Sequence, residues 1–224
     1  MLAISPQMPL ANRALFVSGN IDAARTHLSQ RFWPHSVTPL DPGTAFAFRH
    51  HQAEFAQTSF NALRYGTAVA IDSQPSDPSY LVKFTLDGAS EVDQGGTVVA
   101  SNAGMVCVMN PTRRLRVRLS ADHNQLTLRV AGSVLHDCIE REFGTAVRQP
   151  LEFEATARHV NECAPGLGRL VGTLCEDLDA PAAGFRHPRV AGHLEQTLVG
   201  LLLTELPHNY STLLASSAAP AAPA

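Results

Sequence analysis

The stretch LRVRLSADHNQLTLRV, residues 115–130, alternates between apolar and polar side chains in both of its halves. The apolar residues of each half fall on one face: Leu115, Val117 and Leu119 in the first, and Leu126, Leu128 and Val130 in the second. Successive side chains of a strand point to opposite faces, so this period of two predicts two half-buried β-strands. The Asp-His-Asn sequence at 122–124 is typical of the turn between them.

The same short-strand pattern extends upstream from this stretch. Turn residues such as the glycine pair at 95–96 separate segments rich in β-branched and aromatic residues. That pair predicts a hairpin, because glycine adopts the positive φ values that tight turns need. So many short strands at close spacing predict a sandwich or barrel. The strands are expected in TAFAFRHH (44–51), FNALRYGTAVAI (60–71), YLVKFTLDG (80–88), SEVDQGGTVVAS (90–101) and GMVCVMNP (104–111).

Helical patterns flank the strands on both sides. A first helix is predicted over about 22–33, with Asn20 as its N-cap and Pro34 as its end. After the strands, apolar residues recur at helical spacing in 133–143, 165–178 and 188–206. PLEFEA at 150–155 is expected to add a last strand. The predicted segments are an N-terminal arm and helix (1–33), a barrel (34–156), a helical dimerisation segment (157–213) and an Ala/Pro linker start (214–224).

Composition limits the classes of function that the chain can have. Its 224 residues carry a net charge of −3, whereas a domain that binds DNA by itself usually has a basic face. The four cysteines form no CxxC pair and are expected to be buried thiols in a reducing compartment. Neither a signal peptide nor a segment long enough to cross a membrane is apparent, so we expect a soluble, cytoplasmic protein.

No catalytic or metal site is predicted from the motifs. The segment AGMVCVMNPTRRL (103–115) imitates the second metal-binding motif of cupin enzymes, but Arg113 and Arg114 stand where a histidine ligand should follow. A second candidate, with His50, His51 and Glu54, lies too early in the chain and lacks further ligands. Since no nucleophile or phosphate-loop motif is present either, we expect no cofactor and no metal.

A small barrel can instead enclose one compact molecule between apolar walls with a few polar anchors. If that molecule is an acid, Arg49 or Lys83 is the expected anchor. His50 and His51 point to opposite faces of a strand, so at most one of them can face inward. The arginines of RRLRVRL (113–119) are expected on a solvated outer face, with an anion pocket as the alternative. The predicted ligand-binding residues are Trp33, Arg49, His51, Tyr65, Tyr80 and Lys83.

The last long helix has an apolar stripe wider than one groove needs. One interpretation is packing against the barrel or the neighbouring helix, and the other is a homodimer interface. Both can hold, because a helix can show one flank to each. The predicted interface residues are Leu194, Leu198, Leu201 and Leu202.

Several segments resemble the N-terminal effector-binding domain of AraC/XylS-type bacterial transcription regulators. These are FNALRYGTAVAI with its Arg64, the long run from YLVKFTLDG to Val130, and HPRVAGHLEQTLVGLLLTELPHNYS (187–211). The resemblance extends from about Phe16 to Ala224, and its motifs are patterns of spacing. It implies a cupin-like double-stranded β-helix that binds a small effector, often an aromatic acid or an amine-derived metabolite, and helices that dimerise.

The resemblance also implies a C-terminal domain with two helix-turn-helix units, for which this sequence has no residues. We therefore expect DNA binding only through that absent domain, and we interpret LLASSAAPAAPA (213–224) as the start of the linker to it. A metal-dependent cupin enzyme, such as a dioxygenase or isomerase, is the alternative function. A structural jelly roll without a ligand is the third.

Overall fold

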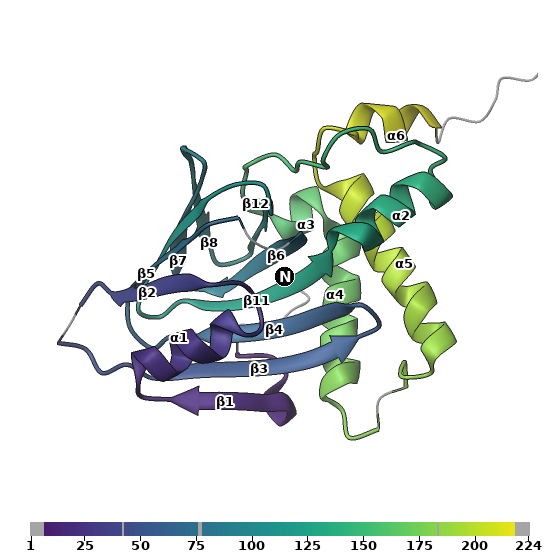
Figure 1. The fold of residues 1–224 in the computed structure, drawn as a ribbon. Coiled ribbons are helices and arrows are strands. Elements are labelled where there is room, and N and C mark those ends of the chain that lie inside the picture. The colour runs from purple at the N-terminus through teal and green to yellow at the C-terminus, as the bar shows by residue number, and fades with distance from the viewer. Residues whose placement is uncertain (1–6, 42, 76–77, 183, 218–224) are drawn as a thin grey trace, which may run out of the picture.

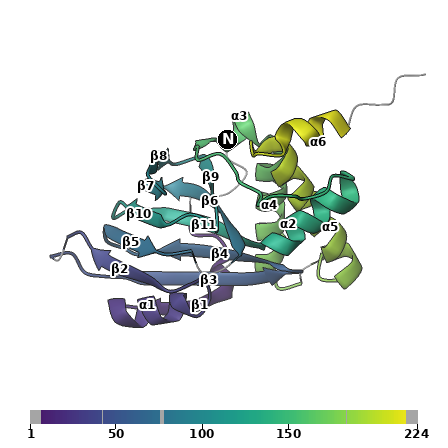
Figure 2. The same cartoon turned by 45° about the horizontal axis from the view of Figure 1, so that its top comes forward.

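The computed structural model describes residues 7–41, 43–75, 78–182 and 184–217 and has three layers. A five-stranded sheet faces a seven-stranded sheet, and helices cover the other face of the larger sheet (Figures 1 and 2). The predicted fold class, α+β and mainly β, is confirmed, because two antiparallel sheets face each other and a helical segment follows them. Every pair of neighbouring strands is antiparallel.

The seven-stranded sheet has the order β1-β3-β4-β11-β6-β9-β12. Its strands are β1 (Ala14–Ser18), β3 (Phe48–Phe55), β4 (Thr58–Arg64), β11 (Asn124–Ala131), β6 (Ser79–Asp87), β9 (Met105–Met109) and β12 (Arg158–His159). The five-stranded sheet has the order β2-β5-β10-β7-β8. Its strands are β2 (His35–Pro39), β5 (Val69–Ser73), β10 (Leu115–Leu119), β7 (Ala89–Gln94) and β8 (Thr97–Asn102).

The two halves of the 115–130 stretch form strands, but they do not pair with each other. β10 lies between β5 and β7 in the smaller sheet, whereas β11 lies between β4 and β6 in the larger one. The turn at 121–123 therefore carries the chain from one sheet to the other. The predicted hairpin at Gly95 and Gly96 is confirmed between β7 and β8, and both glycines have positive φ.

The four predicted helices are confirmed as α1 (Ile21–Ser29), α2 (Gly132–Glu142), α4 (Pro165–Asp179) and α5 (Pro188–Glu205). The side chain of Asn20 caps α1 by accepting a hydrogen bond from the Ala23 amide at 2.9 Å. The structure adds the short elements η1 (Ala11–Arg13), α3 (Val160–Cys163) and α6 (Ser211–Ser217). PLEFEA forms no strand; its Phe153 makes one isolated bridge to His208.

The predicted linker start at 214–224 overlaps the last helix. Residues 211–217 belong to α6, and the buried Leu214 packs with the helical layer, so the chain is still folded there. Residues 218–224 lie outside the described residues.

Two apolar cores share the seven-stranded sheet. The inner core lies between the sheets and includes Trp33, Phe48, Leu63, Leu81 and Val117. The outer core lies between the seven-stranded sheet and the helices and includes Phe60, Val82, Phe84, Leu174 and Leu198. Strands β4, β6 and β11 contribute alternate side chains to the two sides, as the period of two predicts.

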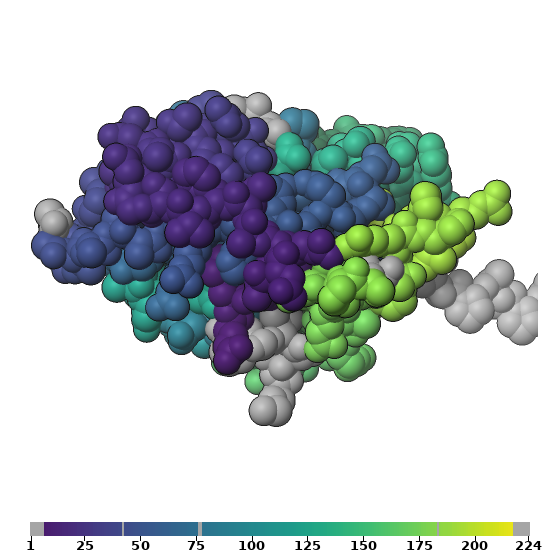
Figure 3. Space-filling view, turned by 90° about the horizontal axis from the view of Figure 1, so that it is seen from below, coloured from purple at the N-terminus to yellow at the C-terminus, as the bar shows by residue number. Residues whose placement is uncertain are grey.

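The N-terminal arm joins the barrel to the helices. In η1, the Asn12 amide donates to Asp179 Oδ1 at 2.7 Å, and Arg13 Nε donates to the Leu178 carbonyl at 2.7 Å. The Arg13 contact, and a further one from Asn12 Nδ2 to the Asp179 carbonyl at 3.2 Å, satisfy carbonyl groups at the C-terminal end of α4 that have no partner within the helix. Figure 3 shows this arm (purple) against the helical layer (green).

The outer core corrects part of the predicted dimer interface. Leu198 and Leu202 are fully buried within their own chain, where they pack against the sheet and the other helices. They are therefore not available for contact with a second copy. Leu194 and Leu201 are half-buried at the edge of the same core.

Candidate functional site

The inner core contains a partly open cavity of about 80 Å³ between the two sheets. Its walls are mainly apolar, and one side is closed by α1 and the segment that follows it. The lining residues from this segment are Leu28, Phe32, Trp33 and His35. Those from the seven-stranded sheet and the residue after β4 are Leu63, Tyr65, Leu81, Lys83, Met109, Gln125 and Thr127, and those from the five-stranded sheet are Ile71, Ser73, Leu115, Val117 and Leu119.

Lys83 is the one lining residue, among those described, that ordinarily carries a full charge. It lies in the middle of β6, and its side chain is 1% exposed. Nζ donates a hydrogen bond to Ser90 Oγ of β7 at 2.5 Å. Burial lowers the pKa of Lys83 below its ordinary value, because the charged form loses its hydration.

Three polar side chains in and just before β11 form a hydrogen-bonded chain beside Lys83. Gln125 Nε2 donates to Thr127 Oγ1 at 3.0 Å, so the Gln125 carbonyl oxygen is free to accept from His123 Nε2 at 3.0 Å. Burial lowers the pKa of His123 to about 4, which keeps its ring neutral at pH 7. The hydroxyl of Thr127 accepts the Gln125 hydrogen, so its own hydrogen can be donated to a ligand.

A second polar chain links α1 to the same inner sheet face. His27 Nε2 lies 2.9 Å from His50 Nδ1, and His50 Nε2 lies 3.1 Å from Asn61 Oδ1. The Asn61 amide nitrogen faces acceptors on Ser59 and Thr127, so its oxygen faces His50 and receives a hydrogen from it. Burial lowers the pKa of His50 to about 4. His50 therefore accepts from His27, and this contact fastens α1 over the barrel.

The structure brings three of the six predicted ligand-binding residues to the cavity. Trp33, Tyr65 and Lys83 line it. Arg49 is exposed on the opposite face of β3. Two further predicted residues also lie away from it: His51 bonds to the Pro9 carbonyl, and Tyr80 donates to the Leu151 carbonyl in the outer core.

Sequence reasoning missed the polar side chains that β2, β5 and β11 bring to the cavity. These are His35, Ser73, Gln125 and Thr127. Gln125 and Thr127 alternate with the apolar Leu126 and Leu128, so the period of two already placed them on the inner face. Nothing in the local sequence marks His35 or Ser73, because their positions depend on long-range pairing: β5 pairs with β10, and β2 pairs with β5.

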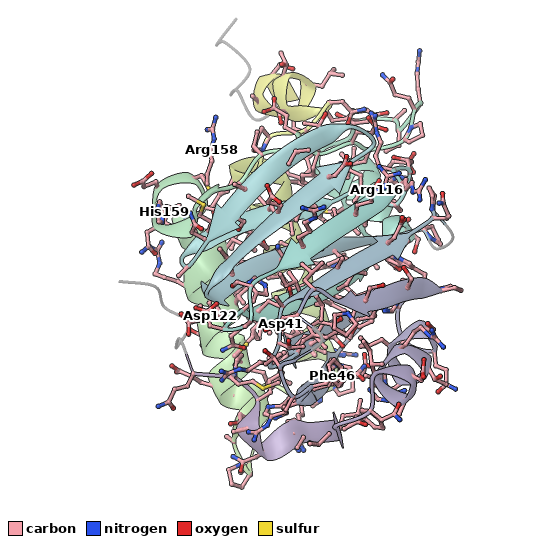
Figure 4. The ribbon with its side chains drawn as sticks, turned by 90° about the vertical axis from the view of Figure 1, so that its left-hand side faces the viewer. Asp41, Phe46, Arg116, Asp122, Arg158 and His159 are labelled. Atoms are coloured by element: carbon pink, nitrogen blue, oxygen red, sulfur yellow. The ribbon has the colours of Figure 1, made fainter. Side chains whose placement is uncertain are left out.

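The Arg116 and Arg118 side chains of β10 are exposed on the outer face of the smaller sheet, as the solvated interpretation predicts. Arg114 donates to both carboxylate oxygens of Asp72, at 3.0 and 2.6 Å. Arg116, which is labelled in Figure 4, forms longer ion pairs with Asp72 and Asp93. Among the described residues, no group of three or more His, Cys, Asp or Glu is placed to hold a metal ion. No helix in the described ranges is long and apolar enough to cross a membrane.

A protein-family model covers most of the described chain. Residues 24–203 match the model of the AraC-binding-like domain. The probable thc operon regulatory protein of Rhodococcus erythropolis is 26% identical over 202 residues, which cover 89% of this chain and 61% of that protein. This chain thus spans less than two thirds of its relative's length.

Two solved structures are similar to this chain to different extents. The AraC-like transcriptional activator CuxR superposes with a TM-score of 0.60 over 93% of this chain and 72% of its own, at 12% identity. The cupin domain of Schizosaccharomyces pombe Cnp3 matches 48% of this chain and 80% of its own, with a TM-score of 0.33 and 10% identity. The first likeness extends through both the barrel and the helical layer.

Proposed function

The chain belongs to the AraC-binding-like domain family, and from this we propose that it is the effector-sensing and dimerisation module of a transcriptional regulator. The observation that carries the proposal is the partly open cavity between the sheets, with mainly apolar walls and the Lys83, Thr127 and Gln125 side chains in its lining. Family membership favours a regulator over the cupin enzyme as the function of this fold.

The proposed ligand is a compact molecule with an apolar body and one polar group. An acid would be held by Lys83 and not by Arg49, since Arg49 lies outside the cavity. A cavity of about 150 Å³ holds benzene, and this one is near 80 Å³. The size therefore favours a short aliphatic effector over an aromatic one.

We propose that effector binding biases the chain between two arrangements of the N-terminal arm and helices. Two observations on residues 11–33 support this mechanism. Leu28 of α1 and Phe32 after it close one side of the cavity, and Asn12 and Arg13 of η1 contact α4. A homodimer through the outward face of α5 would pass this bias to the partner. In the full-length regulator, DNA would be read by a further domain, and the proposed location is the cytoplasm.

A thermal-shift screen with short acids, aldehydes, amines and alcohols tests the proposal. We expect at least one of these compounds to raise the melting temperature, because a ligand that binds only the folded chain stabilises it. Val117→Phe fills the cavity and should abolish that increase. Val98→Phe is the matched control, because Val98 is 62% exposed on β8 and its variant should respond like the wild type.

An effector that stabilises the Val117→Phe and Val98→Phe variants equally would contradict binding in the cavity. The baseline melting temperature of each variant is measured first, so that a loss of stability from overpacking is separated from a loss of the ligand response.

A further inference from the structure

The burial of Lys83 without a counter-charge is the least expected feature of the cavity. Lys83 is the only lysine of the chain, it is 1% exposed, and its Nζ has Ser90 Oγ as its hydrogen-bond acceptor. Within the described ranges the cavity lining contains no Asp or Glu, and no ion pair joins Lys83 to a carboxylate. Burying an ammonium ion without a counter-charge is costly.

This environment favours the neutral amine. Desolvation accordingly lowers the pKa of Lys83. An ordinary lysine is protonated at pH 7 and has no lone pair to offer, whereas a desolvated lysine in an apolar pocket is a nucleophile. A nucleophilic amine can form a covalent bond with an electrophilic carbon that enters the cavity.

Two neighbours on the same sheet face complete the arrangement. Thr127 stands directly opposite Lys83 in the β6–β11 pair, and Cys107 stands opposite it in the β6–β9 pair. Directly opposite residues share a face of the sheet. Thr127 can donate its hydroxyl hydrogen to an oxygen beside Lys83, because Gln125 already donates to its lone pair. Burial raises the pKa of the Cys107 thiol, so Cys107 stays protonated and leaves the amine as the nucleophile.

The walls favour a neutral ligand over an anionic one. A carboxylate would bring a charge between apolar walls and would need Lys83 to gain a proton. A carbonyl compound enters without charge, and its oxygen can accept from Thr127 while its chain contacts Leu63, Leu81 and Val117. The volume of about 80 Å³ leaves room for only a few carbon atoms.

We propose that the cavity captures a short-chain aliphatic aldehyde as a reversible imine on Lys83. This inference rests on the proposed sensor function and assigns the chemical class of its effector. The Nζ lone pair adds to the carbonyl carbon, the π electrons move to oxygen, and one N–H proton is transferred to that oxygen. The resulting carbinolamine loses its hydroxyl group with the second N–H proton as one water molecule, which leaves the C=N bond. No electrons are gained or lost.

Reductive trapping tests the proposal directly. The full chain is incubated with propanal and cyanoborohydride at pH 7, and the propylated peptides are identified by mass spectrometry. With one lysine in the chain, the two reactive amines are Lys83 and the α-amino terminus. We expect Lys83 to be labelled at least tenfold faster in the native chain than in guanidinium chloride at the same pH. The terminus should react similarly in both and serves as the internal reference.

Three variants test the roles of the Lys83 amine and the Thr127 hydroxyl. Lys83→Met removes the amine and should lose both the Lys83 label and the rise in melting temperature that propanal gives. Lys83→Arg keeps a nitrogen hydrogen-bond donor but forms no imine and should lose the same two responses. Thr127→Val keeps the side-chain shape and should slow labelling of Lys83 several-fold. Near-UV circular dichroism checks that each variant is folded.

Labelling of the terminus alone, or slower labelling of Lys83 in the native than in the unfolded chain, would overturn the imine. Stabilisation by propanoate in the absence of Lys83 labelling would also overturn it, yet would leave the sensor function intact. The sensor function fails separately, when no compound of the wider screen distinguishes Val117→Phe from Val98→Phe.

Discussion

His123 illustrates how one buried residue affects the stability of the whole barrel. It is 2% exposed, its Nε2 bonds to Gln125, and its Nδ1 has no hydrogen-bond partner among the described residues. Burial strips the charged ring of its hydration and is the main reason that its pKa falls from 6.5 to about 4, and a second proton on Nδ1 would have no acceptor among the described residues.

The free energy of unfolding should therefore depend on pH through His123. Its folded pKa lies below its unfolded pKa, so the unfolded chain binds the proton more tightly between pH 6.5 and 4. The contribution of His123 is fully present above pH 6.5 and is lost as the pH falls to 4. A gap of this size corresponds to about 3 kcal/mol.

Urea unfolding of His123→Gln at pH 4.5 and pH 7 measures this contribution. Relative to the wild type, the variant should lose about 2–3 kcal/mol less between the two pH values. His193→Gln is the control, because His193 is exposed on α5 and should leave the pH dependence unchanged. Equal pH dependence in wild type and His123→Gln would contradict a buried neutral ring.

At the residue scale, much of the site was predictable from the period of two. Tyr80 and Lys83 are three positions apart in one strand, so both could not face the cavity, and the same rule separates His50 from Arg49 and His51. What the alternation leaves open is which face is the inner one. Both faces of β6 are buried, because helices cover its other side, so burial alone does not distinguish them.

At the scale of elements, local pattern predicted the strands and helices but not the pairing. The turn at 121–123 looks like a hairpin turn, yet it crosses between sheets. Strand partners depend on contacts far apart in the sequence, such as β10 with β5 and β11 with β4, which no local window contains. β1 was missed because an exposed edge strand lacks a buried apolar face.

One buried carboxylate connects α5 to the barrel. Glu195 is 5% exposed and accepts hydrogen bonds from the Gln57 amide and from Thr58 Oγ1, both at 2.8 Å. These groups lie in the tight β3–β4 turn, where Ala56 has a φ of 52° in the left-handed region. Glu195 therefore supports a strained turn from the helical layer.

Glu195→Ala should lower the free energy of unfolding by about 2–4 kcal/mol, because it leaves the buried Thr58 hydroxyl and the partly buried Gln57 amide without their acceptor. Glu195→Gln keeps one acceptor oxygen and should cost less than half as much. Urea unfolding at pH 7 gives both values. If the two variants are equally stable, the carboxylate does not hold the turn.

At the scale of the whole molecule, the proposed homodimer can be tested without disturbing the outer core. A side chain added at Gly200 meets nothing within 4 Å, so Gly200→Arg should leave the single chain folded. If the outward face of α5 pairs two copies, this variant should give a monomer by light scattering, whereas the wild type gives a dimer.

Thr173→Arg is the matched control, because Thr173 is exposed on the neighbouring helix α4. This variant should retain the wild-type mass. If Gly200→Arg is still a dimer, the outward face of α5 is not the interface, and another surface pairs the two copies.

The seven-stranded sheet is a single wall between the cavity and the helices, and this has a consequence for protein engineering. In β6 and β11, odd-numbered positions such as 83 and 127 line the cavity, and even-numbered positions such as 82 and 128 pack against the helices. Libraries that vary the odd positions alone would alter the cavity wall and retain the packing of the helical layer. Libraries that vary the even positions alone would alter that packing and retain the cavity wall, so that the two sides become separately adjustable in alternate codons of one short gene segment.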